Sequence, residues 1–499
     1  MRFSNRTYAL ICLFFFQLLS LSGFGQKVTG PVTPTGPVDM EEAIGIALRN
    51  NPQLNQAGLQ VEGSIVSLEQ SKWMRWPSLN FNASQGFSFG RNIDPFTNQF
   101  VQQNISYNNY QLGAGVTLYN GGQQHHTIAR NELSAKASQK DYEAARNDLM
   151  LNVALGYLQI LNNQELVTVA DRQMEATRQQ VVRMEKLVDA GAEAQSKLLD
   201  LKAQLANEEL NLLNAQNNLE TSRLSLKQLM NIPGAFVLEV KSVPLKDPEL
   251  LAYDATVNEV FEAALSHLPQ FEAARFKIEA AERGISVARG KFLPTLTMSA
   301  GLSTAYSSNA PKQLFIANGT PATKAEVLSK TQFIDIDGSR QYITDIVTIP
   351  GGAYKQYNYF GILDFNRNSS VSLNLRVPIF NNFQAKYGVA NAKLQKLSAE
   401  YDQQLATNTV RQNIEQAYVN MTNAAKRYSA TVNQVDAFTE AFRAAESRFN
   451  AGALSSAEFN IAKANLDRGK ANLVQTKYDY IFRVKVLDFY MAKPLNLDQ

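Results

Sequence analysis

The side chains that could carry chemistry are few in this chain of 499 residues. Its histidines are His125, His126 and His267, and its one cysteine is Cys12. Adjacent histidines point to different faces of a helix, so His125 and His126 do not form a chelating pair. None of the three has a carboxylate or cysteine at a spacing suited to a metal or an activated nucleophile. The sequence therefore predicts no catalytic residue, no metal and no cofactor, and the chain is not expected to be an enzyme.

Charged residues recur at fixed distances after two glycines, Gly191 in the stretch DAGA and Gly452 in the stretch NAGA. Lys197 and Asp200 follow Gly191 by six and nine residues, and Glu458 follows Gly452 by six. Such side chains can form ion pairs or satisfy free N–H groups at a helix start. The sequence favours capping for Glu458, because it stands three residues after a serine in the S-x-x-E pattern of a capping box. The two roles do not exclude each other.

The elements that position these residues form a tandem repeat. The segment ALRNNPQL (47–54) aligns with ALSHLPQF (264–271) at an offset of 217, and LYNGGQ (118–123) aligns with IFNNFQ (379–384) at an offset of 261. The difference between the two offsets places 44 extra residues in the second copy. Internal repetition of this kind predicts two structural units of the same architecture.

Each copy contains two segments in which apolar and small polar residues alternate. The predicted strands cover about 78–90 and 105–119 in the first copy, and about 295–305 and 369–380 in the second. Leucine, phenylalanine and valine share one face, and asparagine, serine, threonine and glycine share the other. Strands of about ten residues with this alternation are typical of a membrane β-barrel. A soluble sandwich with one wet face would show the same pattern.

The remainder of each copy is predicted to form a long helical hairpin. No proline occurs from Gly122 to about Val188, and a helix of that length would reach about 100 Å. Each return helix carries a large apolar residue at every seventh position, which favours supercoiling against neighbouring helices. Gly191 and Gly452, equivalent in the two copies, are expected to cap the outgoing helices with φ > 0. The heptad residues are Leu198, Leu205, Leu212, Leu219 and Leu226, and Phe459, Leu466, Leu473, Tyr480 and Leu487.

The repeats are predicted to cover residues 39–233 and 256–494, with other segments before, between and after them. Residues 1–25 place Arg2 and Arg6 before an apolar run, the layout of a secretory signal peptide. No later segment is apolar over about 20 residues, so no transmembrane helix is expected. Without Arg2 and Arg6 the charges nearly balance, which argues against a nucleic-acid partner. The other segments are a flexible leader at 26–38, a connector at 234–255 and a C-terminal tail at 495–499.

The predicted fold class is an α+β membrane protein in which each chain supplies four strands. Four strands cannot close a membrane barrel, because the smallest need about eight. Open edges in lipid would leave backbone groups unpaired at several kcal/mol each. Several copies must therefore share one barrel. Two copies would give eight strands and a filled lumen, whereas three would give twelve and a wider lumen, so a trimer is favoured.

A signal peptide, a duplicated unit of strands and long helices, and glycine-marked turns together resemble the TolC family of outer-membrane efflux proteins. The resemblance covers about residues 39–494. It implies a homotrimer with a shared 12-strand β-barrel in the outer-membrane lipid, continued by coiled-coil helices as a periplasmic α-helical tunnel. It also implies a passive exit duct of a tripartite efflux or type I secretion system, exporting small molecules or proteins. The implied partners are a periplasmic adaptor (membrane fusion) protein and an inner-membrane pump of the RND or ABC class.

The resemblance also assigns roles to the turns and to the charged residues beyond them. Family members carry acidic residues six and nine positions after the second glycine; here these positions hold Glu458 and Ile461. A tyrosine and an arginine that lock the closed opening in the family correspond to Phe449 and Leu454. The implied adaptor-docking residues are Ala190, Gly191, Ala192, Ala451, Gly452 and Ala453, and the candidate periplasmic gate comprises Lys197, Asp200 and Glu458. Our hypothesis is that Lys197 and Glu458 pair between adjacent hairpins and hold the opening narrow.

The extra residues of the second copy are expected to form one outward loop, about 306–368. Within it, FIDIDGSRQYIT (333–344) predicts a small hairpin that turns at Asp337 and Gly338. The competing hypothesis for the whole chain is a trimeric coiled-coil surface protein with a β-barrel anchor. It accounts for the heptads and the signal peptide, but not for the recurrence of strand pairs. A soluble sandwich enzyme is the third alternative.

Overall fold

The computed structural model describes residues 32–493, with gaps at 35, 94–97, 103, 242–247, 249–252 and 311–312. The predicted signal peptide at 1–25 and the predicted tail at 495–499 therefore lie outside the described residues. The predicted leader and connector lie partly outside them.

The helices of the two copies match in length and position. The first copy holds α2 (Met40–Asn50), α3 (Pro52–Trp73), α4 (Gln123–Asp189) and α5 (Gln195–Leu229), and the second holds α6 (Val257–His267), α7 (Pro269–Gly290), α9 (Gln384–Asn450) and α10 (Ser456–Tyr490). The paired helices have 11, 22, 67 and 35 residues in both copies. Their first residues differ by the offsets of 217 and 261 that the sequence alignment gives. The helices of the two copies therefore correspond one to one.

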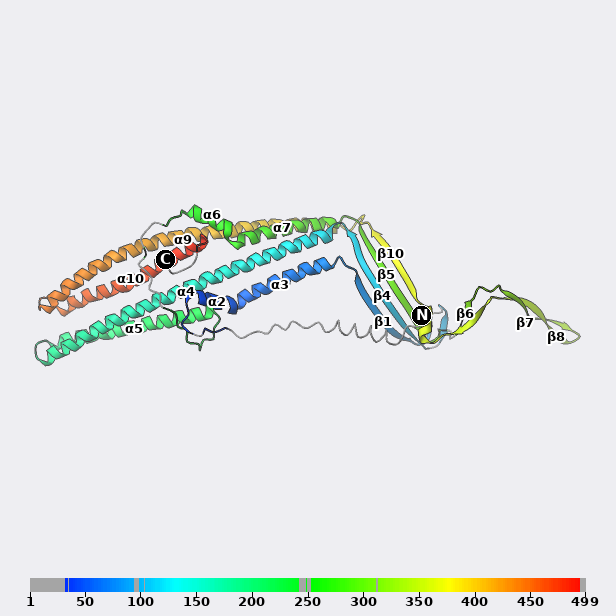
Figure 1. Ribbon diagram of the computed structural model, residues 1–499, viewed down its shortest axis with the longest axis horizontal. Helices are drawn as coiled ribbons and strands as arrows, with labels where there is room; N and C mark the ends of the chain where they lie inside the picture. The colour runs from blue at the N-terminus through cyan, green and yellow to red at the C-terminus, as the bar shows by residue number, and fades with distance from the viewer. Residues whose placement is uncertain are drawn as a thin grey trace. The chain divides into compact units, whose positions relative to one another are not determined.

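The four predicted strands form one antiparallel sheet (Figure 1). It contains β1 (Ser78–Ser88), β4 (Ile105–Asn120), β5 (Thr295–Ser307) and β10 (Asn368–Arg376), in the order β1-β4-β5-β10. Strands β4 and β5 join the two copies, and β1 and β10 are the edges. The last strand ends at Arg376 rather than near residue 380. Pro378 explains the difference, because proline has no N–H to donate to a strand ladder.

Shorter strands occupy the connections between these four. Strands β2 (Arg91–Ile93) and β3 (Phe100–Gln102) pair between β1 and β4. The longer connection between β5 and β10 holds β6 (Gln313–Ala317), β7 (Thr323–Ile336), β8 (Ser339–Ile349), β9 (Gly352–Gln356) and α8 (Tyr359–Phe365). Strand β6 pairs with β9, and β7 pairs with β8.

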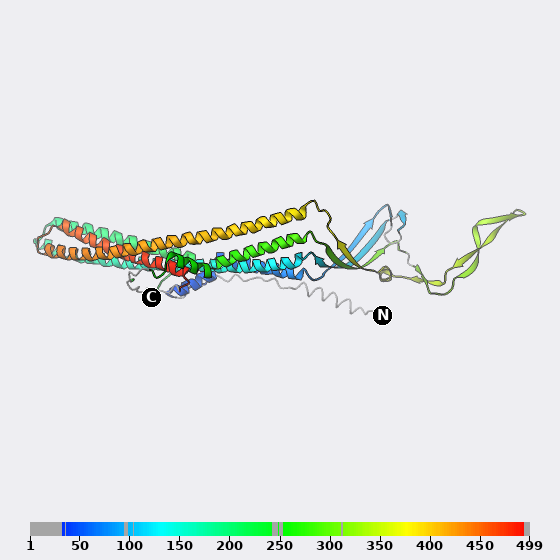
Figure 2. The ribbon, with the colours of Figure 1, turned by 90° about the horizontal axis from the view of Figure 1, so that it is seen from above.

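The chain divides into two compact units, each of which draws on both copies. Of the described residues, unit 1 comprises those from 32 to 62, 137 to 275 and 402 to 493, and unit 2 comprises those from 63 to 136 and 276 to 401. Unit 1 contains α5, α10 and the parts of α4 and α9 from residues 137 and 402 onward, and the turns of the two helical hairpins, α4–α5 and α9–α10, lie at the same end of their helices in both views (Figure 2). Unit 2 contains the sheet. Among the described residues, no helix combines the length and the apolarity that crossing a membrane requires.

Buried apolar side chains hold the hairpins of unit 1 together in two clusters. In the first, Tyr157 of α4 is fully buried, and its hydroxyl donates to the carbonyl oxygens of Val38 and Lys241. Val474 and Tyr478 of α10 pack into the same cluster, so the second hairpin shares the core of the first. The second cluster joins α6, α9 and α10 around residues such as Ile414 and Leu487.

Candidate functional site

The register of the sheet separates an apolar face from a polar face. Leu79, Ala114, Ala300 and Val371 stand opposite one another across the four strands. One residue further along, the equivalent row is Asn80, Gly113, Gly301 and Ser370. Because side chains alternate along a strand, the two rows lie on opposite faces. The alternation predicted from the sequence is therefore aligned across all four strands.

The apolar face of the sheet is exposed in the single chain. Large side chains on it include Leu79, Phe81, Phe87, Leu112, Leu302, Val371, Leu373 and Leu375, all of them exposed. An exposed apolar surface that extends across a sheet marks contact with lipid or with another protein. Within the part of the chain that the structure describes, the edge strands β1 and β10 each pair with a strand of this sheet on one side only. Both features require something outside the single chain to cover them.

The turns of the two hairpins adopt the same backbone conformation. Gly191 has a φ of 68°, and Gly452 has a φ of 73°. In the first turn, the N–H of Gly191 donates to Val188 at 2.9 Å and that of Ala192 donates to Leu187 at 2.8 Å. The second turn repeats both bonds, from Gly452 to Phe449 at 3.0 Å and from Ala453 to Arg448 at 2.8 Å. This is the Schellman pattern, so the predicted glycine caps are confirmed.

The surface of both turns is open. The predicted docking residues are all exposed: Ala190, Gly191, Ala192, Ala451, Gly452 and Ala453. A Cβ atom added at Gly191 or Gly452 would meet no atom within 4 Å. Small residues therefore leave the turn backbone accessible, and the glycines are required by φ rather than by lack of space.

The helix starts after the two turns differ. Ser455 and Glu458 form the predicted capping box: Glu458 N–H donates to the serine hydroxyl at 3.3 Å, and Ser455 N–H donates to the carboxylate at 3.2 Å. Hydrogen bonds from the Ser455 hydroxyl and backbone lower the pKa of Glu458. In the first hairpin, Ala194 holds the capping position and makes no side-chain bond. Lys197, at the position equivalent to Glu458, forms an ion pair with Glu193 at 2.7 Å.

The gate residues thus have partners within their own hairpins. Lys197 contacts Glu193, Glu458 contacts Ser455, and Asp200 is exposed on α5. The hypothesis of a Lys197–Glu458 pair concerns adjacent hairpins, which include those of neighbouring chains, and it stays a prediction.

The side chain of Phe449 joins the ends of the two hairpins. Phe449 of α9 stacks on Phe459 of α10, with ring centroids 4.5 Å apart. It also packs against a buried cluster of the first hairpin, formed by Val181, Met184, Leu198 and Leu201. The ammonium group of Lys197 lies 5.9 Å from the centre of the Phe449 ring. Phe449 therefore connects the hairpins at the position that corresponds to the family's tyrosine; because Phe449 and Leu454 replace that tyrosine and the arginine, the sequence does not carry the family's lock intact.

A buried ion pair, which the sequence analysis missed, also joins the hairpins. Lys463 of α10 contacts Glu208 of α5 at 2.8 Å, and both side chains are 5 % exposed. Lys463 also contacts Asp467 at 2.7 Å. The second carboxylate oxygen of Glu208 accepts from the Thr177 hydroxyl at 2.5 Å, and Gln204 donates to the first at 2.8 Å. Buried charges need such partners, because burial in an apolar medium without them is costly.

A signal for this ion pair exists in the heptad pattern. Glu208 stands one heptad after Leu201 and three heptads before Leu229, at a position where an apolar residue is expected. A charged residue at an apolar heptad position indicates a buried partner. The pattern does not identify that partner, because Lys463 lies 255 residues away.

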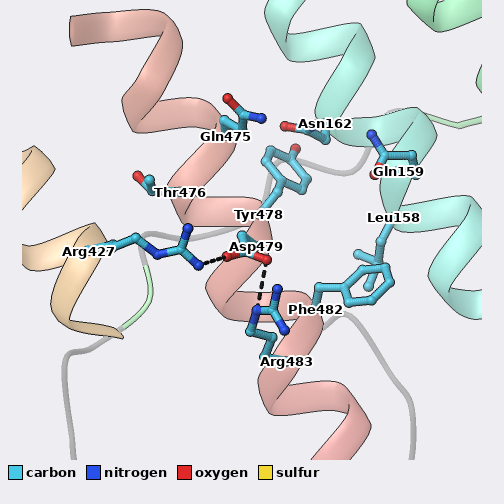
Figure 3. A pocket seen from close by; sticks show the side chains of 10 residues that line it. All are labelled: Leu158, Gln159, Asn162, Arg427, Gln475, Thr476, Tyr478, Asp479, Phe482 and Arg483. Atoms are coloured by element: carbon cyan, nitrogen blue, oxygen red, sulfur yellow. Dashed lines mark hydrogen bonds and ion pairs between the residues drawn. The ribbon is translucent and has the colours of Figure 1, made fainter. Parts of the chain in front are cut away.

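A polar cavity of about 500 Å³ lies between α4, α9 and α10 (Figure 3). On one side, Arg427 of α9 and Arg483 of α10 both donate to Asp479, each at 2.9 Å. Gln159 and Asn162 of α4 line the other side. Burial raises the pKa of Tyr478, and the negative charge of Glu165 adds to this shift, so the phenol stays protonated. The arginines are partnered by Asp479, which assigns this cluster to holding α9 against α10.

Within the described residues, no group of three or more histidine, cysteine, aspartate or glutamate side chains could hold a metal ion. The geometry instead consists of a sheet with an exposed apolar face, two long helical hairpins and open turns. Together these features define a membrane-inserted channel component with a helical extension. The chain belongs to the outer membrane efflux protein family, whose sequence model matches residues 43–231 and 351–491. Members of this family are located in the outer membrane, and so is this protein.

Individual proteins agree with this assignment. The chain is 22% identical over 457 residues to the outer membrane protein TolC of Vibrio cholerae, covering 89% of each chain. It is 21% identical over 476 residues to the proteases secretion protein PrtF of Dickeya chrysanthemi, covering 93% of this chain and 88% of the relative. The crystal structure of the outer membrane protein VceC from Vibrio cholerae superposes with a TM-score of 0.67 at 16% identity, covering 91% of this chain and 94% of VceC. That structure supports the fold.

Proposed function

We propose that three copies of the chain form a passive exit duct through the outer membrane. The observation that carries this proposal is a four-stranded sheet with one exposed apolar face and two unpaired edges. Lipid tolerates no open sheet edge, so the edge strand β1 of one copy must pair with β10 of the next. Three copies supply twelve strands, enough for a lumen wider than side chains can fill.

The two faces of the sheet fit this arrangement. The face with Leu79 and Val371 would contact lipid, and the face with Asn80 and Ser370 would line the lumen. Small polar side chains leave the lumen wide and wet, which gives little chemical selectivity. A cargo of small molecules or proteins is consistent with this surface, and the relative PrtF is named for protease secretion.

The hairpins would continue the duct as a tunnel in the periplasm, and their turns would dock the adaptor protein of a tripartite system. Exposure of Ala190, Gly191, Ala451 and Gly452 supports this role, because a partner helix can approach the turn backbone closely. The energy for transport would come from an inner-membrane pump of the RND or ABC class.

Recordings in planar lipid bilayers test the duct. The purified protein is expected to produce discrete ion-conducting steps, whereas a surface fibre should leave the bilayer resistance unchanged. A preparation that inserts into the bilayer without conducting steps would contradict the proposal.

The gate is tested by charge reversal at its residues. If Lys197 and Glu458 pair between neighbouring hairpins, Glu458→Lys places two like charges together and raises the conductance. The double variant Lys197→Glu with Glu458→Lys restores the pair and should return conductance toward that of the unmodified protein. Equal conductance in all three proteins would remove these two residues from the gate, without affecting the duct itself.

A further inference from the structure

Strands β7 and β8 form a two-stranded ribbon inside the segment that the first copy lacks. The ribbon closes at Asp337 and Gly338, whose φ angles are 50° and 81°. Two successive residues with positive φ are typical of the type I′ turn, and the sequence predicts the turn at this place. The connection therefore contains a regular hairpin rather than an irregular loop.

One face of the ribbon, the apolar face, carries six large aliphatic side chains, together with Asp345, which stands opposite Val327, and Gln341. The register places Val347 opposite Ala325 and Ile349 opposite Thr323, and it shifts between Leu328 and Phe333. Beyond the shift, Ile334 stands opposite Gln341. The large apolar side chains of this face are Val327, Ile334, Ile336, Ile343, Val347 and Ile349, and they are between 39% and 54% exposed. The opposite face carries four charged residues, Lys324, Glu326, Asp335 and Arg340, which are interspersed with the apolar residues Leu328, Phe333, Tyr342 and Ile346.

A ribbon of this kind needs a covering partner. An isolated two-stranded hairpin is marginally stable in water and requires a third strand or an apolar surface to pack against. Its exposed strand edges and apolar side chains would otherwise promote aggregation.

We propose that the apolar face of each ribbon packs against the apolar faces of the ribbons in neighbouring copies of the chain. Three ribbons would then form a bundle over the outer opening of the duct. This proposal rests on the trimer of the proposed function. The chain topology brings the ribbons together, because β7 and β8 follow Ser307, the end of β5, and precede Asn368, the start of β10. Helices connect to the other end of the sheet, where α4 follows Asn120 of β4 and α7 precedes Thr295 of β5.

Attachment to a common barrel favours contact with the ribbon of a neighbouring copy over contact with an independent partner. Three ribbons attached to one barrel are present at an effective concentration on the order of millimolar, which populates even weak contacts. The net charge of the ribbon opposes the contact only weakly, although Asp345 lies on the apolar face. Residues 323–349 carry three basic side chains, Lys324, Lys330 and Arg340, against four acidic ones, Glu326, Asp335, Asp337 and Asp345. With a net charge of only −1, the ribbons repel one another weakly.

Disulfide cross-linking of the full-length protein in detergent tests the bundle. Ile343→Cys places a thiol on the apolar face, and the matched control Thr344→Cys places one on the opposite face of the same strand. After mild oxidation, the fraction of covalently linked chains is expected to be about ten times larger for Ile343→Cys than for Thr344→Cys. Only the apolar face contacts the ribbons of neighbouring copies, which are present at high effective concentration. Val327→Cys and Glu326→Cys form a second such pair on β7.

Light scattering on the same samples separates this proposal from the trimer. Samples that are trimeric and link through the apolar face support the bundle. Trimeric samples that link equally through both faces, or not at all, overturn the bundle and leave the duct intact; this is also the result expected if lipid or another protein covers the ribbon. Monomeric samples overturn both proposals.

Discussion

The two helical hairpins share their helix lengths and turn geometry, but they differ in the contacts that hold them. In the first hairpin, the hydroxyl of Thr177 on α4 donates a hydrogen bond to the carboxylate of Glu208 on α5. The equivalent positions of the second hairpin hold Phe438 and Gly469, and a Cβ at Gly469 would lie 3.1 Å from the Phe438 ring. Lys463, equivalent to Lys202, crosses to the first hairpin instead of pairing within its own.

This difference shows which properties the two copies of the repeat share and which have diverged. Helix lengths and the glycine turns are the same in both copies. In the proposed duct they would determine where the tunnel ends. The side chains between the helices have diverged, so that α10 supplies the cation and α5 the buried carboxylate. The hairpins are therefore not interchangeable, and substitutions at equivalent positions should have unequal effects.

The largest difference in stability is expected between alanine substitutions of the two equivalent lysines, Lys463 and Lys202. Lys463→Ala leaves Glu208 buried without its cation, which should destabilise the helical unit by about 3–5 kcal/mol. Lys202→Ala removes an ion pair with Glu185 whose side chains are 49% and 42% exposed, and the expected loss is about 0–1 kcal/mol. Thermal unfolding followed by far-UV circular dichroism measures both. Equal shifts for the two variants would contradict the asymmetry.

The glycine turns should respond equally, in contrast to the lysines. Gly191→Ala and Gly452→Ala each force a side chain into a left-handed conformation, at roughly 1–2 kcal/mol. Space is not limiting at either position. Hydrogen exchange at the turns measures the local opening, with Ala190→Ser and Ala451→Ser as controls outside the left-handed position. A response confined to one turn would show that the turns are not equivalent.

A smaller effect is expected at the starts of the return helices. Ser455→Ala removes the capping box of α10 and should destabilise its first turn by about 1 kcal/mol. The double variant Ala194→Ser with Lys197→Glu builds the same box on α5, and amide exchange in its first turn should slow. If the transferred box has no effect on α5, the difference between the helix starts has another origin.

The last comparison concerns how the contribution of Asp467, which contacts Lys463, to stability depends on pH. Burial raises the pKa of Asp467 above its usual value of 3.8, against the opposing effect of Lys463. The ionised form is thus disfavoured in the folded protein, so this group's favourable contribution to stability is present at pH below 3.8 and is lost as the pH rises through the raised pKa. The melting temperature of Asp467→Asn relative to that of the unmodified protein should therefore rise with pH over this interval. A constant difference would contradict the raised pKa.

Local patterns made much of this fold predictable. The alternating strands, the glycine caps and the Ser455–Glu458 box each depend on residues within a few positions of one another. The ion pair of Lys463 with Glu208 and the packing of Phe449 against the first hairpin depend on how two hairpins align, which no local period specifies. The heptad position of Glu208 indicates only that a partner exists. The pairing of Lys197 with Glu458 concerns adjacent hairpins and stays a prediction.

The number of chains in the detergent-solubilised particle tests the central claim most directly. Native mass spectrometry of the purified protein counts them without reference to any substitution. The account predicts three chains, because twelve strands close a barrel with an open lumen. A stable particle of one chain, with the apolar face of its sheet packed against its own helices, would contradict it.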